Sequence, residues 1–181
     1  MFLASKDESF QNFVKLVKRV KREQDERIVA IRSDHGGEFE NIHFMEFCEA
    51  NGILHQFSTP RTPQQNSVVE RRNRTLQEIA RTMLLENNLP TYFWAEAVNT
   101  ACYILNRFNL RQGIKKILFE LYYDKKPNVS YFKAFGCKCF ILNTKENVGK
   151  FEAKSDQGIF LGYSNTSKAY KTYNLRTNSL E

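Results

Sequence analysis

Two acidic residues, Asp34 and Glu70, stand where carboxylates can take part in chemistry. Asp34 follows a short apolar run, at the point where a strand would end, and Gly36 and Gly37 come soon after it. A strand end holds a side chain rigidly, and the two glycines let the backbone turn and leave room for a phosphate chain. Thirty-five residues separate Asp34 from Glu70, which lies near the start of a helical pattern. Hard carboxylate oxygens are ligands that suit Mg²⁺.

Each acid also has an ordinary structural role open to it. An aspartate at a strand end commonly caps a turn by accepting hydrogen bonds from its own backbone. Glu70 has Arg74 one helical turn further on, and such a pair on an exposed helix face contributes only about 0.2–0.5 kcal/mol. Asp34 and Glu70 by themselves do not distinguish these structural roles from metal binding.

The first sixty residues predict two helices and two strands. Residues 5–8 have the Ser-x-x-Glu form of a capping box, and apolar residues at helical spacing follow. Residues 28–31 are apolar throughout, as expected of a strand covered on both sides. Asn41 is expected to cap a second helix that ends at Gly52 in the left-handed conformation. Residues 53–58 predict the second strand.

A long helix is predicted to begin near residue 63. Thr62 and Gln65 form another capping-box pattern, and Pro63 suits the first helical position, where no amide donor is needed. The helical pattern ends at residues 89–91. Apolar spacing from Trp94 onward predicts one more amphipathic helix. The polar side of the long helix carries Asn66, Glu70, Arg74, Gln77 and Arg81, and its inward side carries Val69, Leu76, Ile79, Ala80 and Met83.

From about residue 107 the pattern changes to short alternating runs. Residues 138–142, 158–163 and 170–175 predict strands separated by turns rich in glycine and asparagine. We therefore expect a linker and then a small, barrel-like antiparallel β-unit. The fold class is α/β followed by this β-unit.

The first hundred residues predict four helices but only two strands. A two-stranded sheet cannot bury so many helical faces or satisfy its own backbone at both edges. We therefore expect the chain to begin partway through a domain.

The formal charge of +7 comes from the later part of the chain. Residues 1–60 carry 8 Lys and Arg against 10 Asp and Glu, whereas residues 61–181 carry 19 against 10. A basic surface favours a polyanionic partner such as nucleic acid. A solvated cationic face that keeps the protein soluble is the alternative.

The four cysteines are too few and too scattered for a disulfide framework, and three histidines accompany them. Cys137 and Cys139 point to one face of a predicted strand, but no second pair at metal-ligand spacing accompanies them. No zinc site in this chain is expected. No stretch approaches the roughly 18 apolar residues of a membrane helix, and no signal-peptide pattern is present.

Three sequence blocks together resemble a known family. RSDHGGEF, GILHQFSTPRTPQQNSVVERRNRTLQEIARTML and the pair FGCKCF and KFEAKSDQGIFLGYSNTSKAYKTYNLRT are similar to the integrase region of copia-type long-terminal-repeat retrotransposon Pol polyproteins. The resemblance implies the C-terminal part of an RNase H-like integrase core at residues 1–108, missing its first strands. It also implies a linker at 109–130 and a small Src-homology-three-like β-barrel, truncated, at 131–181.

The resemblance also implies a chemistry. In the family an Asp, Asp, Glu triad holds two Mg²⁺ (or Mn²⁺) ions, which activate a water or 3′-hydroxyl and stabilise the leaving oxygen. Asp34 matches the second aspartate and Glu70 the glutamate, so both are expected to be catalytic and metal-binding. His35, His43 and His55 are expected to be ordinary loop or strand residues. The residues expected to contact DNA are Arg61, Gln64, Gln65, Asn66, Asn73, Arg74, Gln77 and Arg81.

The sequence departs from the family pattern in three respects. No strand bearing the first catalytic aspartate precedes the first helix, the family's His/His/Cys/Cys zinc segment is missing, and Ser67 stands where the family usually has glycine. Two carboxylates hold a Mg²⁺ pair poorly. We therefore expect no strand transfer by this polypeptide alone, which leaves its status as a polynucleotidyl transferase open.

The functional expectation is a fragment of an integrase that acts in DNA integration through 3′-end processing and strand transfer. The alternatives are a non-catalytic nucleic-acid-binding remnant of a decayed element and an RNase H-like nuclease. Expected partners are DNA, as element ends and target, and further copies of the chain; neither a membrane nor a small-molecule cofactor is expected. The expected location is the nucleus, or a cytoplasmic virus-like particle and then the nucleus.

Overall fold

The computed structural model describes residues 3, 5–59, 66–111, 113–143, 151, 153–164 and 167–181. These residues form two compact units, Met1–Arg72 and Asn73–Glu181, which are described in turn. The predicted capping box at Thr62 and Gln65, with Pro63 between them, lies outside the described residues.

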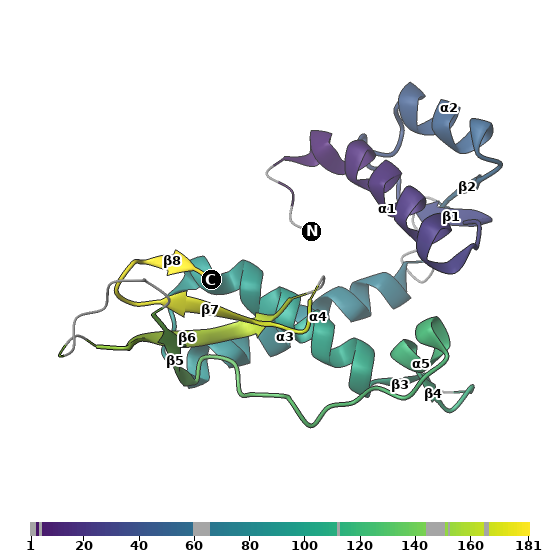
Figure 1. Cartoon of the computed structure of the whole chain (residues 1–181). Coiled ribbons are helices and arrows are strands. Elements are labelled where there is room, and N and C mark those ends of the chain that lie inside the picture. The colour runs from purple at the N-terminus through teal and green to yellow at the C-terminus, as the bar shows by residue number, and fades with distance from the viewer. Residues whose placement is uncertain are drawn as a thin grey trace. The chain divides into compact units, whose positions relative to one another are not determined.

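The first unit has a parallel pair of strands with two helices (Figure 1). β1 pairs with β2 in register from Ala30 opposite Leu54 to Ser33 opposite Phe57. A parallel pair needs a crossover between its strands, and α2 supplies it. The elements are η1 (Lys6–Glu8), α1 (Ser9–Gln24), β1 (Ala30–Ser33), α2 (Ile42–Ala50), β2 (Leu54–Phe57) and the beginning of α3 (Ser67–Glu86).

Aromatic packing forms the core of this unit. Phe44 of α2 is 1% exposed, and its ring stacks on Phe13 of α1 with centroids 4.7 Å apart. Val17, Cys48 and Ile53 complete the buried cluster. Full burial of a side chain such as Phe44 contributes about 1.5–3 kcal/mol, so this cluster joins the two helices to the sheet.

The second helix follows its sequence signals. Asn41 is its N-cap, and its Oδ1 accepts a hydrogen bond from the Phe44 amide at 2.8 Å. Gly52 follows with φ of +65°, the left-handed conformation predicted for it. Both end signals of α2 are confirmed.

Two local predictions in this unit are wrong. The Ser5 side chain makes no capping bond; its hydroxyl donates to Asp7 instead, and a 3₁₀ turn precedes α1. The strand begins at Ala30 and not at residue 28, and Val29 is 75% exposed. None of the residues of β1 is buried, and exposed and half-buried residues alternate along it, so β1 lacks the two-sided cover that its apolar sequence predicted.

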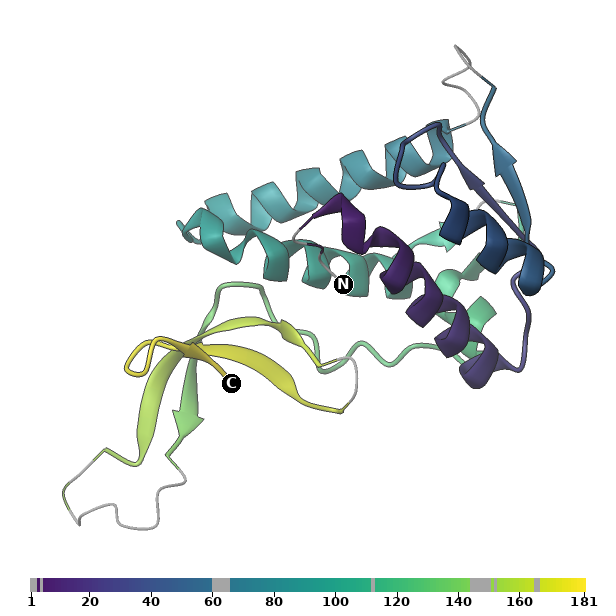
Figure 2. The same cartoon turned by 90° about the horizontal axis from the view of Figure 1, so that it is seen from above.

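The second unit packs a helix pair against an antiparallel sheet (Figure 2). Ala80 and Leu84 of α3 pack with Phe93 and Ala97, and Leu161 of the sheet joins the same buried cluster. The remaining elements are η3 (Thr91–Phe93), α4 (Trp94–Phe108), β3 (Leu110–Arg111), β4 (Lys116–Ile117), α5 (Leu118–Tyr123), β5 (Lys138–Leu142), β6 (Ser155–Tyr163), β7 (Tyr170–Asn174) and β8 (Ser179–Leu180).

This packing corrects one residue of the long helix. Val69 was predicted to turn inward, but it is 60% exposed. The core contacts of α3 come from its later turns, where Ala80 is fully buried and Leu84 is 6% exposed. The first turn of an amphipathic helix does not need to share the burial of its later turns, because burial depends on where a partner element lies.

The sheet has the strand order β5-β6-β7-β8, with every neighbouring pair antiparallel. β5 has the predicted bounds, whereas β6 begins three residues before the predicted residue 158. Residues 109–130, predicted as a linker, include the hairpin β3–β4 and the short helix α5. The mixed α/β class with a following antiparallel β-unit is confirmed.

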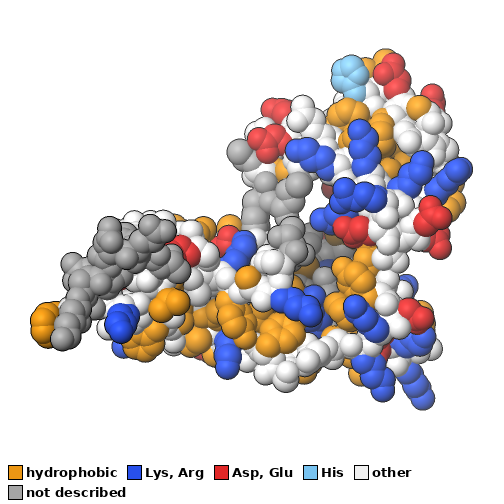
Figure 3. All heavy atoms as spheres, viewed as in Figure 1, with side chains coloured by type: hydrophobic (Ala, Val, Ile, Leu, Met, Phe, Trp, Pro, Cys, Tyr) orange, Lys and Arg blue, Asp and Glu red, His pale blue; other side chains and the backbone are white. Residues whose placement is uncertain are grey.

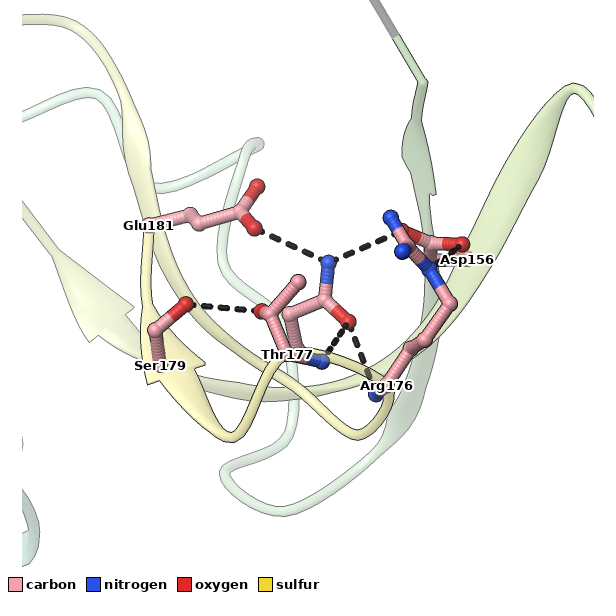
Figure 4. Close-up of polar contacts among 6 residues, drawn as sticks. Asp156, Arg176, Thr177, Ser179 and Glu181 are labelled. Carbon is pink, nitrogen blue, oxygen red and sulfur yellow. Dashed lines mark hydrogen bonds and ion pairs between the residues drawn. The ribbon is translucent and has the colours of Figure 1, made fainter. Parts of the chain in front are cut away.

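Asn174, the last residue of β7, organises the turn between β7 and β8; Figure 4 labels its partners Asp156, Arg176, Thr177 and Glu181. Asn174 is 2% exposed, and its amide nitrogen donates to Asp156 at 3.1 Å and to Glu181 at 2.9 Å. Its oxygen accepts from the amides of Arg176 and Thr177. A buried amide with all these bonds made is stabilising, because a buried polar group without partners would cost about 1–3 kcal/mol.

None of the described helices is both long enough and apolar enough to cross a membrane.

Candidate active site

Asp34 lies directly after β1 and is exposed. Its Oδ1 accepts a hydrogen bond from the Gly36 amide at 3.2 Å. The turn-capping role is therefore present in the structure. That bond involves only one of the two carboxylate oxygens, so turn capping and cation binding are compatible at Asp34.

A second carboxylate, which the sequence did not single out, lies beside the same turn. A Cβ placed on Gly36 would be 2.8 Å from Glu38 Oε2 and 3.2 Å from Asp34 Oδ1. Glycine at this position therefore leaves the space between the two acids open. Lys6 lies 3.3 Å from the other Glu38 oxygen, and a backbone hydrogen bond, together with this ammonium, lowers the pKa of Glu38. Glu38 is thus an anion with a cation already next to it.

Glu70 lies in the first turn of α3 and is exposed. The ion pairs among the described residues do not include a pair between Glu70 and Arg74. The helix pair that offered an ordinary role for Glu70 is therefore not formed. The positive end of the helix dipole also favours a negative charge in this first turn.

A series of hydrogen bonds joins the end of the β1–β2 pair to the start of α3. The Ser58 amide donates to Ser33 O at 2.9 Å, which extends the strand pairing to the residue before Asp34. The Asn66 side chain donates to Ser58 Oγ at 3.3 Å, and the Glu70 amide donates to Asn66 O at 3.0 Å. Within the first unit, the series therefore runs from the carbonyl of Ser33, the residue before Asp34, through Ser58 and Asn66 to the backbone amide of Glu70.

Ser33, Ser58 and Asn66 form this hydrogen-bond series, which the sequence did not identify. Asn66 was predicted to contact DNA, and the structure gives it a part-buried partner in Ser58. Ser58 at the end of the second predicted strand and Ser33 two residues past the first were the available signals, but serine is too common near strand ends to distinguish this role. The predicted DNA contact of Asn66 stays a prediction.

His55 supports the same strand end from the opposite strand. Ser33 Oγ donates its single hydrogen to Asp34 O at 3.0 Å, so the contact of 2.9 Å with His55 Nε2 requires Nε2–H as donor. The remaining ring nitrogen, Nδ1, is buried and has no partner among the described atoms. Burial lowers the pKa of His55. The imidazole is therefore held neutral, as an ordinary strand residue.

The other two histidines lie outside the strands. His35 follows Asp34 in the loop, where its Nδ1 contacts Glu40 and its ring stacks on Phe57 with centroids 5.1 Å apart. His43 lies in α2, not in a loop or strand as predicted.

The predicted DNA-contacting residues fall into three groups. Asn73, Arg74, Gln77 and Arg81 are exposed on α3, as their spacing predicted. Asn66 precedes the helix and bonds to Ser58 as described. The remaining three, Arg61, Gln64 and Gln65, lie outside the described residues.

Across the described part of the chain, no group of three or more His, Cys, Asp or Glu side chains comes together as a metal site would require. The two predicted ligands are nevertheless of a type that fits Mg²⁺, which is commonly held by one or two carboxylates together with waters and substrate phosphates. The donor chemistry therefore suits one ion that substrate helps to bind.

Comparison with known proteins relates both parts of the chain to mobile elements and retroviruses. The family model of the retroviral polymerase SH3-like domain matches residues 137–181. The chain is 40% identical over 171 residues to the retrovirus-related Pol polyprotein from transposon TNT 1-94 of Nicotiana tabacum, which covers 94% of this chain and 13% of that protein. It is 32% identical over 178 residues to the corresponding polyprotein from transposon RE1 of Arabidopsis thaliana, covering 98% of this chain and 12% of that protein.

A solved structure shares the fold. The simian T-cell lymphotropic virus intasome, determined in complex with PP2A regulatory subunit B56 gamma, matches 93% of this chain and 62% of its own chain, with a TM-score of 0.54 and 17% identity. At this identity the likeness establishes the fold alone. The chain spans about one eighth of the length of the curated polyproteins it matches.

Proposed function

Because this chain is homologous to the integrase region of copia-type retrotransposon Pol polyproteins, we propose that it serves DNA integration, as the part of an integrase that supplies two metal-binding carboxylates and a DNA-binding helix. The reaction class is phosphoryl transfer at DNA ends, namely 3′-end processing followed by strand transfer. DNA as partner, assembly with further copies of the chain and a nuclear site of action belong to the same proposal.

The observation that carries this proposal is the hydrogen-bond series from Ser33 through Ser58 and Asn66 to the Glu70 amide. It connects a strand end that bears Asp34 to a helix start that bears Glu70, which supports the proposal that both carboxylates bind one cation. Asp34 and Glu70 would hold the ion. When bound, Mg²⁺ supplies activation of the attacking oxygen and stabilisation of the leaving oxygen.

The exposed polar residues of α3 support the DNA part of the proposal. Arg74 and Arg81 present guanidinium groups, and Asn73 and Gln77 present amide donors, from exposed positions of one helix. Arginine and amide side chains commonly bind phosphate oxygens, which positions a protein on DNA without reading its sequence. Their role here would be to hold the DNA backbone beside Glu70.

Metal binding by the 181-residue chain tests the carboxylate pair. Mn²⁺ is the probe, and its free concentration is measured by electron paramagnetic resonance. We expect Asp34→Asn and Glu70→Gln each to weaken Mn²⁺ binding about tenfold, since each removes one charged ligand. Asp25→Asn and Glu78→Gln are the matched controls, because they make the same charge change at residues outside the proposed site, and they should leave the affinity within about twofold.

If Asp34→Asn and Glu70→Gln bind Mn²⁺ as tightly as their controls, the pair does not hold the ion. The proposal for this site is then withdrawn. A strand-transfer assay with a terminal-repeat DNA end completes the test. Joined product from the unaltered chain, lost in either variant, would contradict the expectation that this polypeptide alone does not catalyse the reaction.

A second candidate, non-catalytic nucleic-acid binding, is favoured by the net positive charge of residues 61–181. Such binding would fall steeply with salt, because phosphate contacts release counterions. It would also survive the double change Asp34→Asn with Glu70→Gln. A nuclease without integration activity, by comparison, would cleave DNA or RNA and form no joined product.

A further inference from the structure

The second unit contains a cavity of about 780 Å³ that has no part in the proposed carboxylate site. Its lining combines five aromatic rings with four cationic side chains, and the lining residues include no Asp or Glu. Figure 3 shows hydrophobic side chains lying next to Lys and Arg side chains on the face of this unit that it draws. The charged lining residues are Arg107, Lys125, Lys126 and Lys168.

Arg107 is held in place by aromatic stacking. Its guanidinium carbon lies 3.4 Å from the centroid of the Tyr103 ring and 4.7 Å from that of Phe119. One of its nitrogens donates to Tyr103 O at 3.1 Å. The ion pairs found among the described residues do not include Arg107. A guanidinium ordered on its faces keeps its edge donors available to bind a phosphate.

The aromatic wall is also ordered. The hydroxyls of Tyr103 and Tyr131 are 2.6 Å apart, and the Tyr170 hydroxyl donates to Tyr131 O at 2.9 Å. Burial, together with the bond to Tyr131, raises the pKa of Tyr103 to about 12, so its ring stays uncharged at neutral pH. Tyr170 is 45% exposed. It therefore offers ring surface on which an incoming planar group can stack.

We propose that this cavity binds an unpaired nucleotide of a single-stranded nucleic acid, with its phosphate near Arg107 and the lysines and its base against Tyr170. The inference rests on the proposed function, since DNA is the polyanion that this part of the chain is proposed to meet. The lining favours this ligand because cationic side chains bind phosphate and aromatic rings stack on any base. The volume is within the range of small-ligand sites.

The site would discriminate between single and double strands. A base inside a duplex is paired and stacked, so it cannot enter a cavity without being extruded. Phosphate contacts at the rim would be available to both forms, but the contact with Tyr170 would be available only to an unpaired base. The cavity therefore predicts a preference for an overhang or a frayed end over blunt duplex.

The test is the binding of a fluorescein-labelled twelve-nucleotide thymidine oligomer and of a blunt duplex of the same length to the 181-residue chain, followed by fluorescence anisotropy. We expect Tyr170→Leu to weaken single-strand binding about tenfold, in keeping with the binding free energy of one base stacked on an aromatic ring. The same change should weaken duplex binding by less than about twofold. Lys126→Ala with Lys168→Ala should weaken single-strand binding more than Lys138→Ala with Lys154→Ala, which removes the same charge outside the cavity.

Trp94 fluorescence and far-ultraviolet circular dichroism of each variant confirm that it is folded. The inference would be overturned if the cavity variants bound the single strand as tightly as the Lys138 and Lys154 control. If the same samples still bound duplex and Mn²⁺, the proposed function would stand despite the failure of the inference. Should the chain bind no duplex, thymidine 5′-monophosphate observed by saturation-transfer NMR still tests the cavity. Displacement of the oligomer by a glutamate-rich peptide at lower concentration than by the mononucleotide would assign the cavity to a protein partner and also overturn the inference.

Discussion

The contact between Gly162 of β6 and Thr100 of α4 gives the sharpest stability prediction for the second unit. Gly162 has φ of +143°, and a Cβ added there would lie 2.2 Å from Thr100 Oγ1. Thr100 is 2% exposed, and its hydroxyl donates to Leu161 O at 2.8 Å. Gly162→Ala therefore combines an unfavourable backbone conformation with a collision against a buried, hydrogen-bonded hydroxyl.

The expected cost of Gly162→Ala is about 4 kcal/mol in the free energy of unfolding. Overpacking at a buried contact costs about 1–3 kcal/mol, and a non-glycine residue in an unfavourable φ region costs about 1–3 kcal/mol. Thr100→Ala removes the hydroxyl and leaves a buried carbonyl without its donor, at a cost of about 2 kcal/mol. Independent effects would add to about 6 kcal/mol in the double variant.

The double variant should instead lose only about 4 kcal/mol. With the Thr100 hydroxyl gone, the Cβ at residue 162 no longer meets an atom at 2.2 Å, and the next nearest atom of Thr100 is its own Cβ at 3.5 Å. The steric part of the Gly162→Ala cost then disappears, while the backbone part remains. The coupling between the two changes is therefore about 2 kcal/mol in favour of the double variant.

Urea unfolding followed by the fluorescence of Trp94 measures these values. Trp94 is the one tryptophan of the chain and lies at the start of α4, so its signal reports on the second unit. Gly113→Ala is the control, because Gly113 has φ of +95° but a Cβ there would meet no atom within 4 Å. The reasoning is refuted if Gly162→Ala costs no more than Gly113→Ala, or if the two changes are additive.

Three further predictions concern single residues. Asn174→Ala should lower the stability of the second unit by about 2–4 kcal/mol in the same Trp94 assay, because several buried hydrogen bonds lose their partner at once; a loss below about 0.5 kcal/mol would contradict the role of Asn174 in the turn. Burial lowers the pKa of His55, so the unfolded chain binds its proton at higher pH than the folded chain, and the first unit should lose stability as the pH falls below about 6.5. Amide hydrogen exchange between pH 5 and pH 8 measures this, and His55→Gln should flatten the dependence; an unchanged slope would assign it to other groups. Asn66→Ala should weaken Mn²⁺ binding about threefold by releasing the start of α3 from Ser58, and affinity equal to that of the unaltered chain would show that this bond does not position Glu70.

Local signals predicted many of the elements well. The Asn41 cap and the left-handed Gly52 end α2 where expected, and β5 has the predicted bounds. These features depend on residues within a few positions of one another, whose conformations are set by steric and hydrogen-bonding preferences of the local chain. Where two local interactions competed, the prediction was less reliable. Ser5 illustrates this, because its hydroxyl bonds to Asp7 and not to the helix amide.

Burial was harder to predict than element type. The apolar run that contains Val29 predicted a strand covered on both faces, and Val69 was predicted to face the core, yet both are exposed in the structure. Hydrophobic spacing shows which residues can be buried together on a face. It does not show which stretch of that face receives a partner.

The sequence by itself determined the α/β class, the polar exposed stripe of α3 and the candidate carboxylates Asp34 and Glu70. Only the tertiary structure decided that Ser58 and Asn66 join the strand end to the helix start, and that Arg107 lies ordered on Tyr103 in an aromatic cavity. The physical reason is that stripes and turns arise from near neighbours along the chain. Cavities and joined strand ends, in contrast, arise from strand register and helix docking between residues far apart in the sequence. Such contacts produce no periodic sequence pattern from which they could be predicted.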